Sequence, residues 1–170
     1  DSQIQSFTVE IEPTMINVTI DGVESSLSAE DPLTRPSDPT KPGYEFTGWY
    51  TDAECTTPYT FTNDPVGLND VTLYSGWNDV RTTPEFTAVP SAISGLSYTG
   101  NDQNLANAGS TDEGTIMYAL SQNGPFSTTI PTGNASDEYT VYYYIAGDEY
   151  HLDSQIQSFT VEIEPTMINV

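Results

Sequence analysis

The chain has 170 residues, and its 25 Asp and Glu against three Lys and Arg leave a formal net charge of −22. So few cations exclude nucleic acid as a partner, because phosphate binding needs clustered positive charge. No run of 18 apolar residues occurs, so we expect no insertion into a membrane. The 11 Tyr, 6 Phe and 2 Trp argue against disorder, because they lie in alternating runs.

An internal repeat gives the clearest signal of organisation. Residues 1–18 read DSQIQSFTVEIEPTMINV, and residues 153–170 are identical, an offset of 153 − 1 = 152 residues. We interpret this as tandem units of about that length, with a cloning duplication as the alternative. The natural chain is then expected to continue after Val170 as it does after Val18, with Thr-Ile-Asp-Gly.

The repeated segment also predicts the domain boundaries. Alternation predicts a strand at residues 7–12, with Phe7, Val9 and Ile11 on one face. We therefore expect residues 1–13 to be the orphan last strand of a preceding repeat. The other boundaries follow from the same pattern: a first domain at 14–78, a second domain at 79–164 and the first strand of the next repeat at 165–170. The junction Pro13-Thr14 restricts bending between neighbours.

The first domain starts with a predicted hairpin. Alternating residues indicate strands at 15–20 and 23–27 around a tight Asp21-Gly22 turn. Four prolines in residues 30–42 indicate a loop. Tyr44, Phe46 and Trp49 are candidate core residues, and further strands are expected at 59–61 and 71–77.

The segments PGYEFTGWYTDAECTTPYTF and VTLYSGW, within residues 41–77, resemble the Listeria–Bacteroides repeat, the B-repeat type of internalin-like surface proteins. The resemblance implies a small β-grasp-like fold in a secreted or wall-bound bacterial protein. It also implies a set of core positions, namely Tyr44, Phe46, Trp49, Tyr59, Leu73, Tyr74 and Trp77.

In the second domain, short alternating runs between turn signals predict a β-sandwich. The candidate strands are 86–89, 96–98, 103–105, 115–120, 127–130, 139–146 and 156–164. Residues 96–150 resemble bacterial immunoglobulin-like surface repeats, and we assign that repeat to about 85–164. The family often has Gly-Thr where Asp137-Glu138 stands here. The fold class expected for the whole chain is all-β, a β-grasp-like domain followed by an immunoglobulin-like sandwich in tandem.

The strand expected at 139–146 has two aromatic faces. Tyr139, Val141, Tyr143 and Ile145 share one face, and Tyr142 and Tyr144 lie on the other. If the first face is core, Tyr142 and Tyr144 are a possible contact surface for a sugar ring or a protein. The alternative is ordinary cross-strand packing on the outside of the sheet.

No enzyme chemistry is indicated. His151 is the single histidine and is expected to be a neutral loop residue, and no G-x-S-x-G, P-loop or G-x-G-x-x-G motif is present. Neither a catalytic nor a cofactor site is expected. Calcium is the fairest metal candidate, yet EF-hand spacing is absent. Lys41 lies in a predicted loop, which disfavours an isopeptide crosslink, and the lone Cys55 is expected as a free thiol.

We therefore predict an extracellular spacer or stalk repeat of a large bacterial cell-surface protein, anchored to the wall through parts outside this chain. Its partners would be neighbouring copies. One alternative is an adhesive repeat that binds a host protein or glycan. A second is a non-covalent fibre, in which Phe7, Val9 and Ile11 carry a strand into another copy. A third is an accessory module of a secreted glycoside hydrolase.

Overall fold

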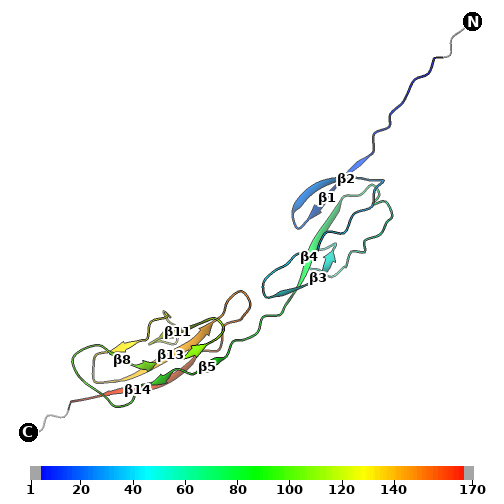
Figure 1. Ribbon diagram of the computed structural model, residues 1–170. Helices are drawn as coiled ribbons and strands as arrows, with labels where there is room; N and C mark the ends of the chain where they lie inside the picture. Colours follow the sequence, from blue (N-terminus) through cyan, green and yellow to red (C-terminus); the bar gives the residue numbers. More distant parts are fainter. Residues whose placement is uncertain (1–4, 167–170) are drawn as a thin grey trace, which may run out of the picture. The chain divides into compact units, whose positions relative to one another are not determined.

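The computed structural model describes residues 5–166, and the chain divides into two compact units, Asp1–Asp79 and Val80–Val170 (Figure 1). The described residues contain strands, turns and bends and no helix, so the prediction of an all-β chain is confirmed. No helix in residues 5–166 could therefore cross a membrane.

Unit 1 contains one four-stranded sheet in the order β2-β1-β4-β3. Its strands are β1 (Met15–Ile20), β2 (Val23–Ser28), β3 (Tyr44–Tyr50) and β4 (Val71–Asp79). β1 pairs antiparallel with β2, β3 pairs antiparallel with β4, and the two central strands β1 and β4 are parallel. The sheet therefore has two antiparallel pairs around a parallel centre, with a helix-free connection between β2 and β3.

The hairpin of β1 and β2 follows from its turn residues. Asp21 and Gly22 have φ angles of 46° and 82°, the positive values that a two-residue hairpin turn of the tight type requires. Ile16 and Val18 are buried while Met15 and Asn17 are exposed, because alternate side chains point to opposite faces of a strand. The expected strands at 15–20 and 23–27 are thus present as β1 and β2.

Aromatic side chains pack along β3 and β4. The Phe46 ring meets the Trp49 ring edge-on at 5.4 Å between centroids and the Trp77 ring at 5.6 Å. Of the seven expected core positions, Trp49 and Leu73 are buried. The other five are half-buried, because a single small sheet covered by loops encloses few side chains completely. These five are Tyr44, Phe46, Tyr59, Tyr74 and Trp77.

The prediction of a strand at 59–61 is wrong. Only Pro58 forms an isolated bridge, to Tyr50, and the N–H of Tyr59 donates to the carbonyl of Trp49 at 2.8 Å. Pro58 has no N–H to extend a ladder. Tyr59 and Phe61 instead pack edge-on against each other at 4.8 Å between centroids.

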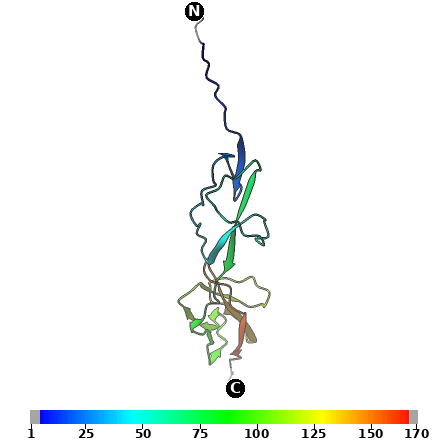
Figure 2. The same ribbon diagram turned by 90° about the vertical axis from the view of Figure 1, so that its right-hand side faces the viewer.

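Residues 5–13 form no strand, so the strand predicted at 7–12 is also wrong (Figure 2). Phe7, Val9 and Ile11 are 88%, 68% and 89% exposed. Within residues 5–166 no strand lies beside this segment to supply hydrogen-bond partners, which is why alternation alone does not make it a strand. Of the strand expected at 165–170, residues 167–170 lie outside the described part, and residues 165–166 are described and form no strand.

Unit 2 is built around the four-stranded sheet β11-β13-β14-β7. The strands of that sheet are β7 (Leu96–Ser97), β11 (Thr115–Ala119), β13 (Glu138–Ala146) and β14 (Gln157–Glu164). Three short ladders complete the unit, formed by β5 (Phe86–Ala88) with β10 (Ser110–Thr111), β6 (Ser91–Ala92) with β9 (Ala106–Asn107), and β8 (Gln103–Asn104) with β12 (Thr132–Gly133).

The core of unit 2 joins the sheet to the short ladders. Val141 and Tyr143 of β13 and Val161 and Ile163 of β14 are buried together with Leu105, which lies between β8 and β9. The N–H of Leu105 donates to the carbonyl of Pro131 at 3.0 Å. The buried face of β13 is therefore the one with Tyr139, Val141, Tyr143 and Ile145, and its middle residues face the ladders.

The three longest strands predicted for unit 2 are present, and the strand predicted at 127–130 is not. The expected strands at 115–120, 139–146 and 156–164 correspond to β11, β13 and β14. Residues 127–130 form only a single bridge, between Ser127 and Tyr118, because Pro125 and Pro131 on either side lack the N–H that a longer ladder needs. The two-residue strands β6, β9, β10 and β12 were not anticipated.

Candidate functional site

The outer face of β13 carries the two tyrosines predicted as a contact surface. Tyr142 and Tyr144 are both half-buried. The ring of Tyr144 stands edge-on to the ring of Phe126, at 5.0 Å between centroids and a 90° angle. Tyr142 lies in register with Ala119 of β11 and Ser158 of β14. Both small neighbours leave part of its ring accessible, so this face combines packing with a limited aromatic surface.

Unit 2 has several open hollows in its described part, and the two larger ones differ from the others in having no charged side chain in their lining. One, of about 460 Å³, is lined by residues between Tyr118 and Thr132, including Pro125, Ile130 and Pro131. The other, of about 690 Å³, is lined mainly by Tyr98, Asn134, Pro165 and Thr166. Neither lining contains an acidic, basic or histidine side chain. These hollows can therefore hold an apolar or neutral polar group, but their linings supply no acid or base for catalysis.

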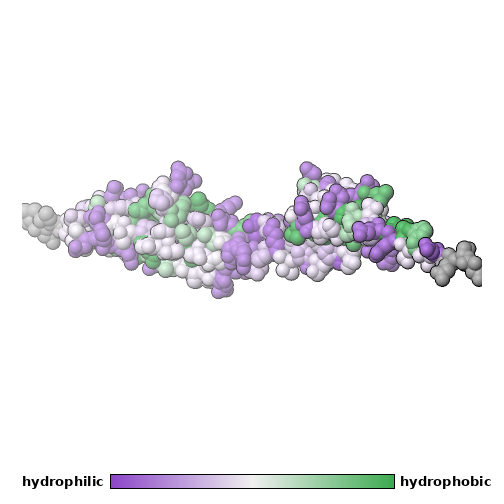
Figure 3. Space-filling model, turned by 90° about the horizontal axis from the view of Figure 1, so that it is seen from above, coloured by the Kyte–Doolittle hydropathy of each residue, from purple (hydrophilic) through white to green (hydrophobic). Residues whose placement is uncertain are grey.

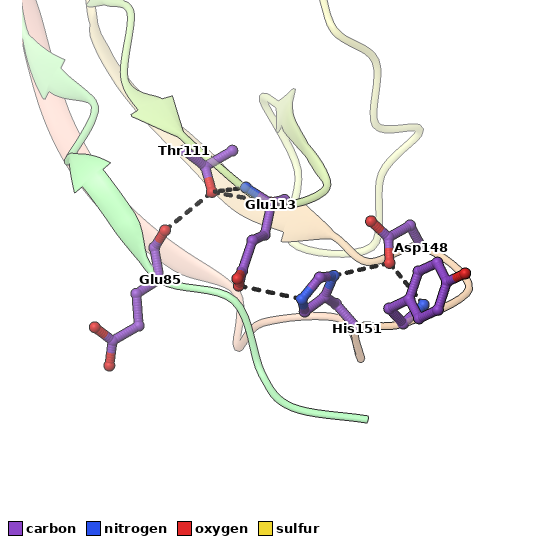
Figure 4. A network of polar contacts seen from close by, with 6 residues as sticks. Glu85, Thr111, Glu113, Asp148 and His151 are labelled. Atoms are coloured by element: carbon purple, nitrogen blue, oxygen red, sulfur yellow. Dashed lines mark hydrogen bonds and ion pairs between the residues drawn. The ribbon is translucent and has the colours of Figure 1, made fainter. Parts of the chain in front are cut away.

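His151 occupies a cluster of carboxylates in unit 2 (Figure 4). Its Nδ1 lies 2.8 Å from Asp148 Oδ1, and its Nε2 lies 3.4 Å from Glu113 Oε2. Its side chain is 17% exposed. A neutral imidazole donates from one nitrogen only, whereas the protonated ring can serve both carboxylates. The arrangement is a histidine between two carboxylates and not a triad, because neither of these two contacts of the ring is with a hydroxyl or a thiol.

The same cluster connects three segments of the chain. Residue 151 pairs with Thr82 in a parallel bridge, and the N–H of Leu152 donates to the carbonyl of Thr82 at 2.9 Å. Thr111 Oγ1 lies 2.9 Å from the carbonyl oxygens of Glu85 and Glu113 and can donate to either (Figure 4). These contacts tie the loop after β13 to the segments at 82–85 and 111–113, which is a structural task.

Several groups among the described residues have shifted pKa values, and each of the following shifts has a local cause. The N–H of Tyr150 lowers the pKa of Asp148, helped by His151. The N–H of Thr56 likewise lowers the pKa of Asp52. Desolvation raises the pKa of the Cys55 thiol, and nearby Asp52 raises it further. Burial raises the pKa of Tyr143. None of these shifts makes a better nucleophile, since a higher pKa leaves less thiolate at neutral pH.

The remaining candidate residues lie apart from one another. Cys55 is a free, half-exposed thiol in a turn with a φ angle of 53°. The Lys41 ammonium lies 3.8 Å from the centroid of the Tyr44 ring, a cation–π contact. Within residues 5–166 no three His, Cys, Asp or Glu side chains gather as a metal site would need.

Sequence reasoning missed the partners of His151. Asp148 precedes His151 by three residues, within Gly147-Asp-Glu-Tyr-His, so its proximity was visible as a turn-like spacing. Glu113 is 38 residues away (151 − 113 = 38). Nothing local marks it, because only the pairing of β11 with β13 brings the start of β11 beside the loop that follows β13.

Comparison with known proteins locates a family in unit 1. Residues 17–75 match the Listeria-Bacteroides repeat domain. The match begins earlier than the resemblance within residues 41–77 indicated and includes most of β1, all of β2 and the proline-rich loop. Internalin H of Listeria monocytogenes serovar 1/2a is 38% identical over 58 residues, which are 33% of this chain and 11% of that protein. The immunoglobulin-like assignment of the second domain remains a prediction.

Proposed function

We propose that this chain is a spacer repeat of a large bacterial cell-surface protein and has no catalytic role. The Listeria-Bacteroides repeat at residues 17–75 and the similarity to internalin H support a surface repeat protein. The identical segments at 1–18 and 153–170 support a tandem array. We further propose that the array is extracellular and attached to the wall through other parts of the protein.

The observation that carries the spacer role is the path of force through unit 1. β1 and β4 are the first and last strands of the unit, and they are parallel neighbours. Tension that enters at the start of β1 and leaves at the end of β4 slides the two strands past each other. Their hydrogen bonds then share the load, whereas an antiparallel hairpin pulled from its two open ends would lose its bonds one after another.

Two aspartates strengthen this parallel pair. Asp70 Oδ1 accepts the N–H of Asn17 at 2.8 Å, and Asp21 Oδ1 accepts the N–H of Ser75 at 2.8 Å. The N–H of Asp21 donates to the carbonyl of Leu73 at 3.0 Å. Hydrogen bonds to charged groups are the stronger ones, so the ladder is reinforced at both of its ends.

Single-molecule stretching tests the proposal. The full chain is pulled from its two ends, and the unfolding force of unit 1 is compared between wild type and Asp70→Ala. We expect a lower force for the variant. Glu24→Ala is the matched control, because it removes an exposed carboxylate from β2, outside the loaded pair. An unchanged force in Asp70→Ala would show that the β1–β4 pair does not bear the load.

The adhesive alternative has one favourable observation, the partly accessible ring of Tyr142. A glycan array and a pull-down from host extracellular matrix test it with the full chain. A spacer gives no saturable binding. Saturable binding that is lost in Tyr142→Ala and kept in Tyr98→Ala would favour adhesion and replace the spacer assignment, since Tyr98 is also exposed but lies elsewhere on unit 2.

A further inference from the structure

The eight residues of β14, Gln157–Glu164, have an identical copy at residues 5–12. The two copies have opposite environments. Val161 and Ile163 are 4% and 1% exposed, whereas the equivalent Val9 and Ile11 are 68% and 89% exposed. The chain therefore carries a second copy of the β14 sequence, which pairs with no strand among residues 5–166. The surface around residues 5–12 includes apolar patches next to the grey atoms on the right of Figure 3.

We propose that the β14 position of unit 2 is a binding site for residues 5–12 of a second copy of this chain, which enter it when the resident β14 is displaced. This interaction does not depend on the spacer role. It is a strand addition in which main-chain bonds supply affinity and alternate side chains supply specificity.

The β14 position selects this sequence by several contacts at once. Six residues of β14 are in antiparallel register with β13, and Ile163 and Glu164 pair in parallel with β7. The buried Val161 and Ile163 belong to the core cluster of unit 2. The Oη of Tyr143 also donates to Gln157 Oε1 at 3.2 Å. Gln5, Val9 and Ile11 provide the same groups at the same spacing.

The resident strand nevertheless holds the position in the intact chain. Both copies offer identical contacts, so the outcome depends on concentration. A tethered strand has an effective concentration on the order of millimolar, far above a micromolar solution of free copies. We therefore expect the wild-type chain to be monomeric at micromolar concentration and to exchange strands only when β14 is removed or damaged.

Charge repulsion weakens the strand-exchanged complex and makes its stability depend on salt. Glu162 lies directly opposite Glu138 in the register, and Glu10 would take the same place. Like charges opposite each other destabilise a strand pair, and the net charge of −22 opposes association of two copies. Added salt should therefore strengthen the exchange, because salt screens exposed charges.

The test vacates the position without shortening the chain. Val161→Asp with Ile163→Asp places two carboxylates in the core and displaces the resident strand. At high micromolar concentration and 150 mM NaCl we expect this double variant to form dimers or larger assemblies in light scattering. We also expect unit 2 to regain folded structure, read from the near-ultraviolet circular dichroism of its tyrosines. Adding Val9→Asp with Ile11→Asp should abolish both effects.

A peptide provides the second measurement. Labelled QSFTVEIE is titrated into the variant that carries all four Asp substitutions, with QSFTDEDE as the matched control. We expect saturable binding of the first peptide, at least tenfold tighter than the second. Assembly that persists with all four substitutions would be unspecific aggregation and would overturn the proposal. The proposal would also be overturned if the variant with Val161→Asp and Ile163→Asp stayed monomeric, whether its unit 2 is unfolded or is filled by its own N-terminal segment. Equal binding of the two peptides would overturn it as well.

Discussion

Ile163→Ala and Ile11→Ala form a matched pair of substitutions in identical sequence. Residues 1–18 and 153–170 are the same, so both changes alter the unfolded chain in the same way. In the folded protein Ile163 is 1% exposed and Ile11 is 89% exposed. Any difference between the two variants in the free energy of unfolding therefore reports the folded environment alone.

The expected cost of Ile163→Ala follows from its burial. The substitution removes three carbon atoms, and about 0.8 kcal/mol per buried CH₂ gives roughly 2.4 kcal/mol of lost transfer energy. A residual cavity raises the total to about 3–4 kcal/mol, inside the usual 2–5 kcal/mol for Ile→Ala in a core. Unit 2 has about 90 residues, so its whole stability is roughly 5–14 kcal/mol. Ile11→Ala should change it by less than about 0.5 kcal/mol.

Urea unfolding separates the two units by probe. Both tryptophans, Trp49 and Trp77, belong to unit 1, so tryptophan fluorescence follows unit 1, while far-ultraviolet circular dichroism follows both units. At low micromolar protein, Ile163→Ala should move the transition of unit 2 to lower urea and leave the fluorescence transition in place. Equal losses in the two variants would refute the reasoning, because Ile11 would then be buried in the folded protein.

Three further outcomes follow from single features. Gly22→Ala should destabilise unit 1 by about 1–2 kcal/mol in the same fluorescence assay, because a φ of 82° is strained for a residue with a Cβ. No atom lies within 4 Å of the added Cβ, so the cost comes from the backbone alone. An unchanged midpoint would mean that the turn relaxes. Asp148→Asn should lower the melting temperature of unit 2 at pH 7, because the lowered pKa of Asp148 means that its carboxylate stabilises the folded unit. This stabilisation is full above the ordinary pKa near 3.8 and is lost as pH falls through the folded pKa. A difference in melting temperature between wild type and variant that stays constant down to about pH 2 would contradict this. Raising NaCl from about 10 to about 150 mM shortens the screening length from about 30 to about 8 Å and should raise both melting temperatures at a net charge of −22; a decrease would show that attractive pairs outweigh repulsion.

Local sequence was sufficient to predict the longer strands and the first hairpin. The alternation at 15–20 and 139–146 and the Asp21-Gly22 turn predicted β1, β13 and the first hairpin, because side-chain period and turn conformation are properties of a few adjacent residues. It separated the two faces of β13, and the structure showed that the face with Val141, Tyr143 and Ile145 is the buried one. Local sequence was not sufficient for four of the two-residue strands, β6, β9, β10 and β12, since two residues carry no period.

The candidate site was only partly predictable. Tyr142 and Tyr144 were identified from alternation, but the contact between Tyr144 and Phe126 joins residues from different parts of the fold. The carboxylates around His151 were not identified as a cluster. Glu113 reaches the ring only because β11 and β13 are paired.

The sequence alone determined that the chain is acidic, β-rich and repetitive, and that an 18-residue segment, which includes residues 5–12 and 157–164, occurs twice. Only the tertiary structure decided what each copy of that segment does. Residues 157–164 are a central strand with Val161 and Ile163 buried, and residues 5–12 are exposed chain, although their side chains are the same. The physical reason is that a strand needs partners. β13 and β7 give the main-chain bonds and the apolar cover to one copy, and no such strands lie beside the other.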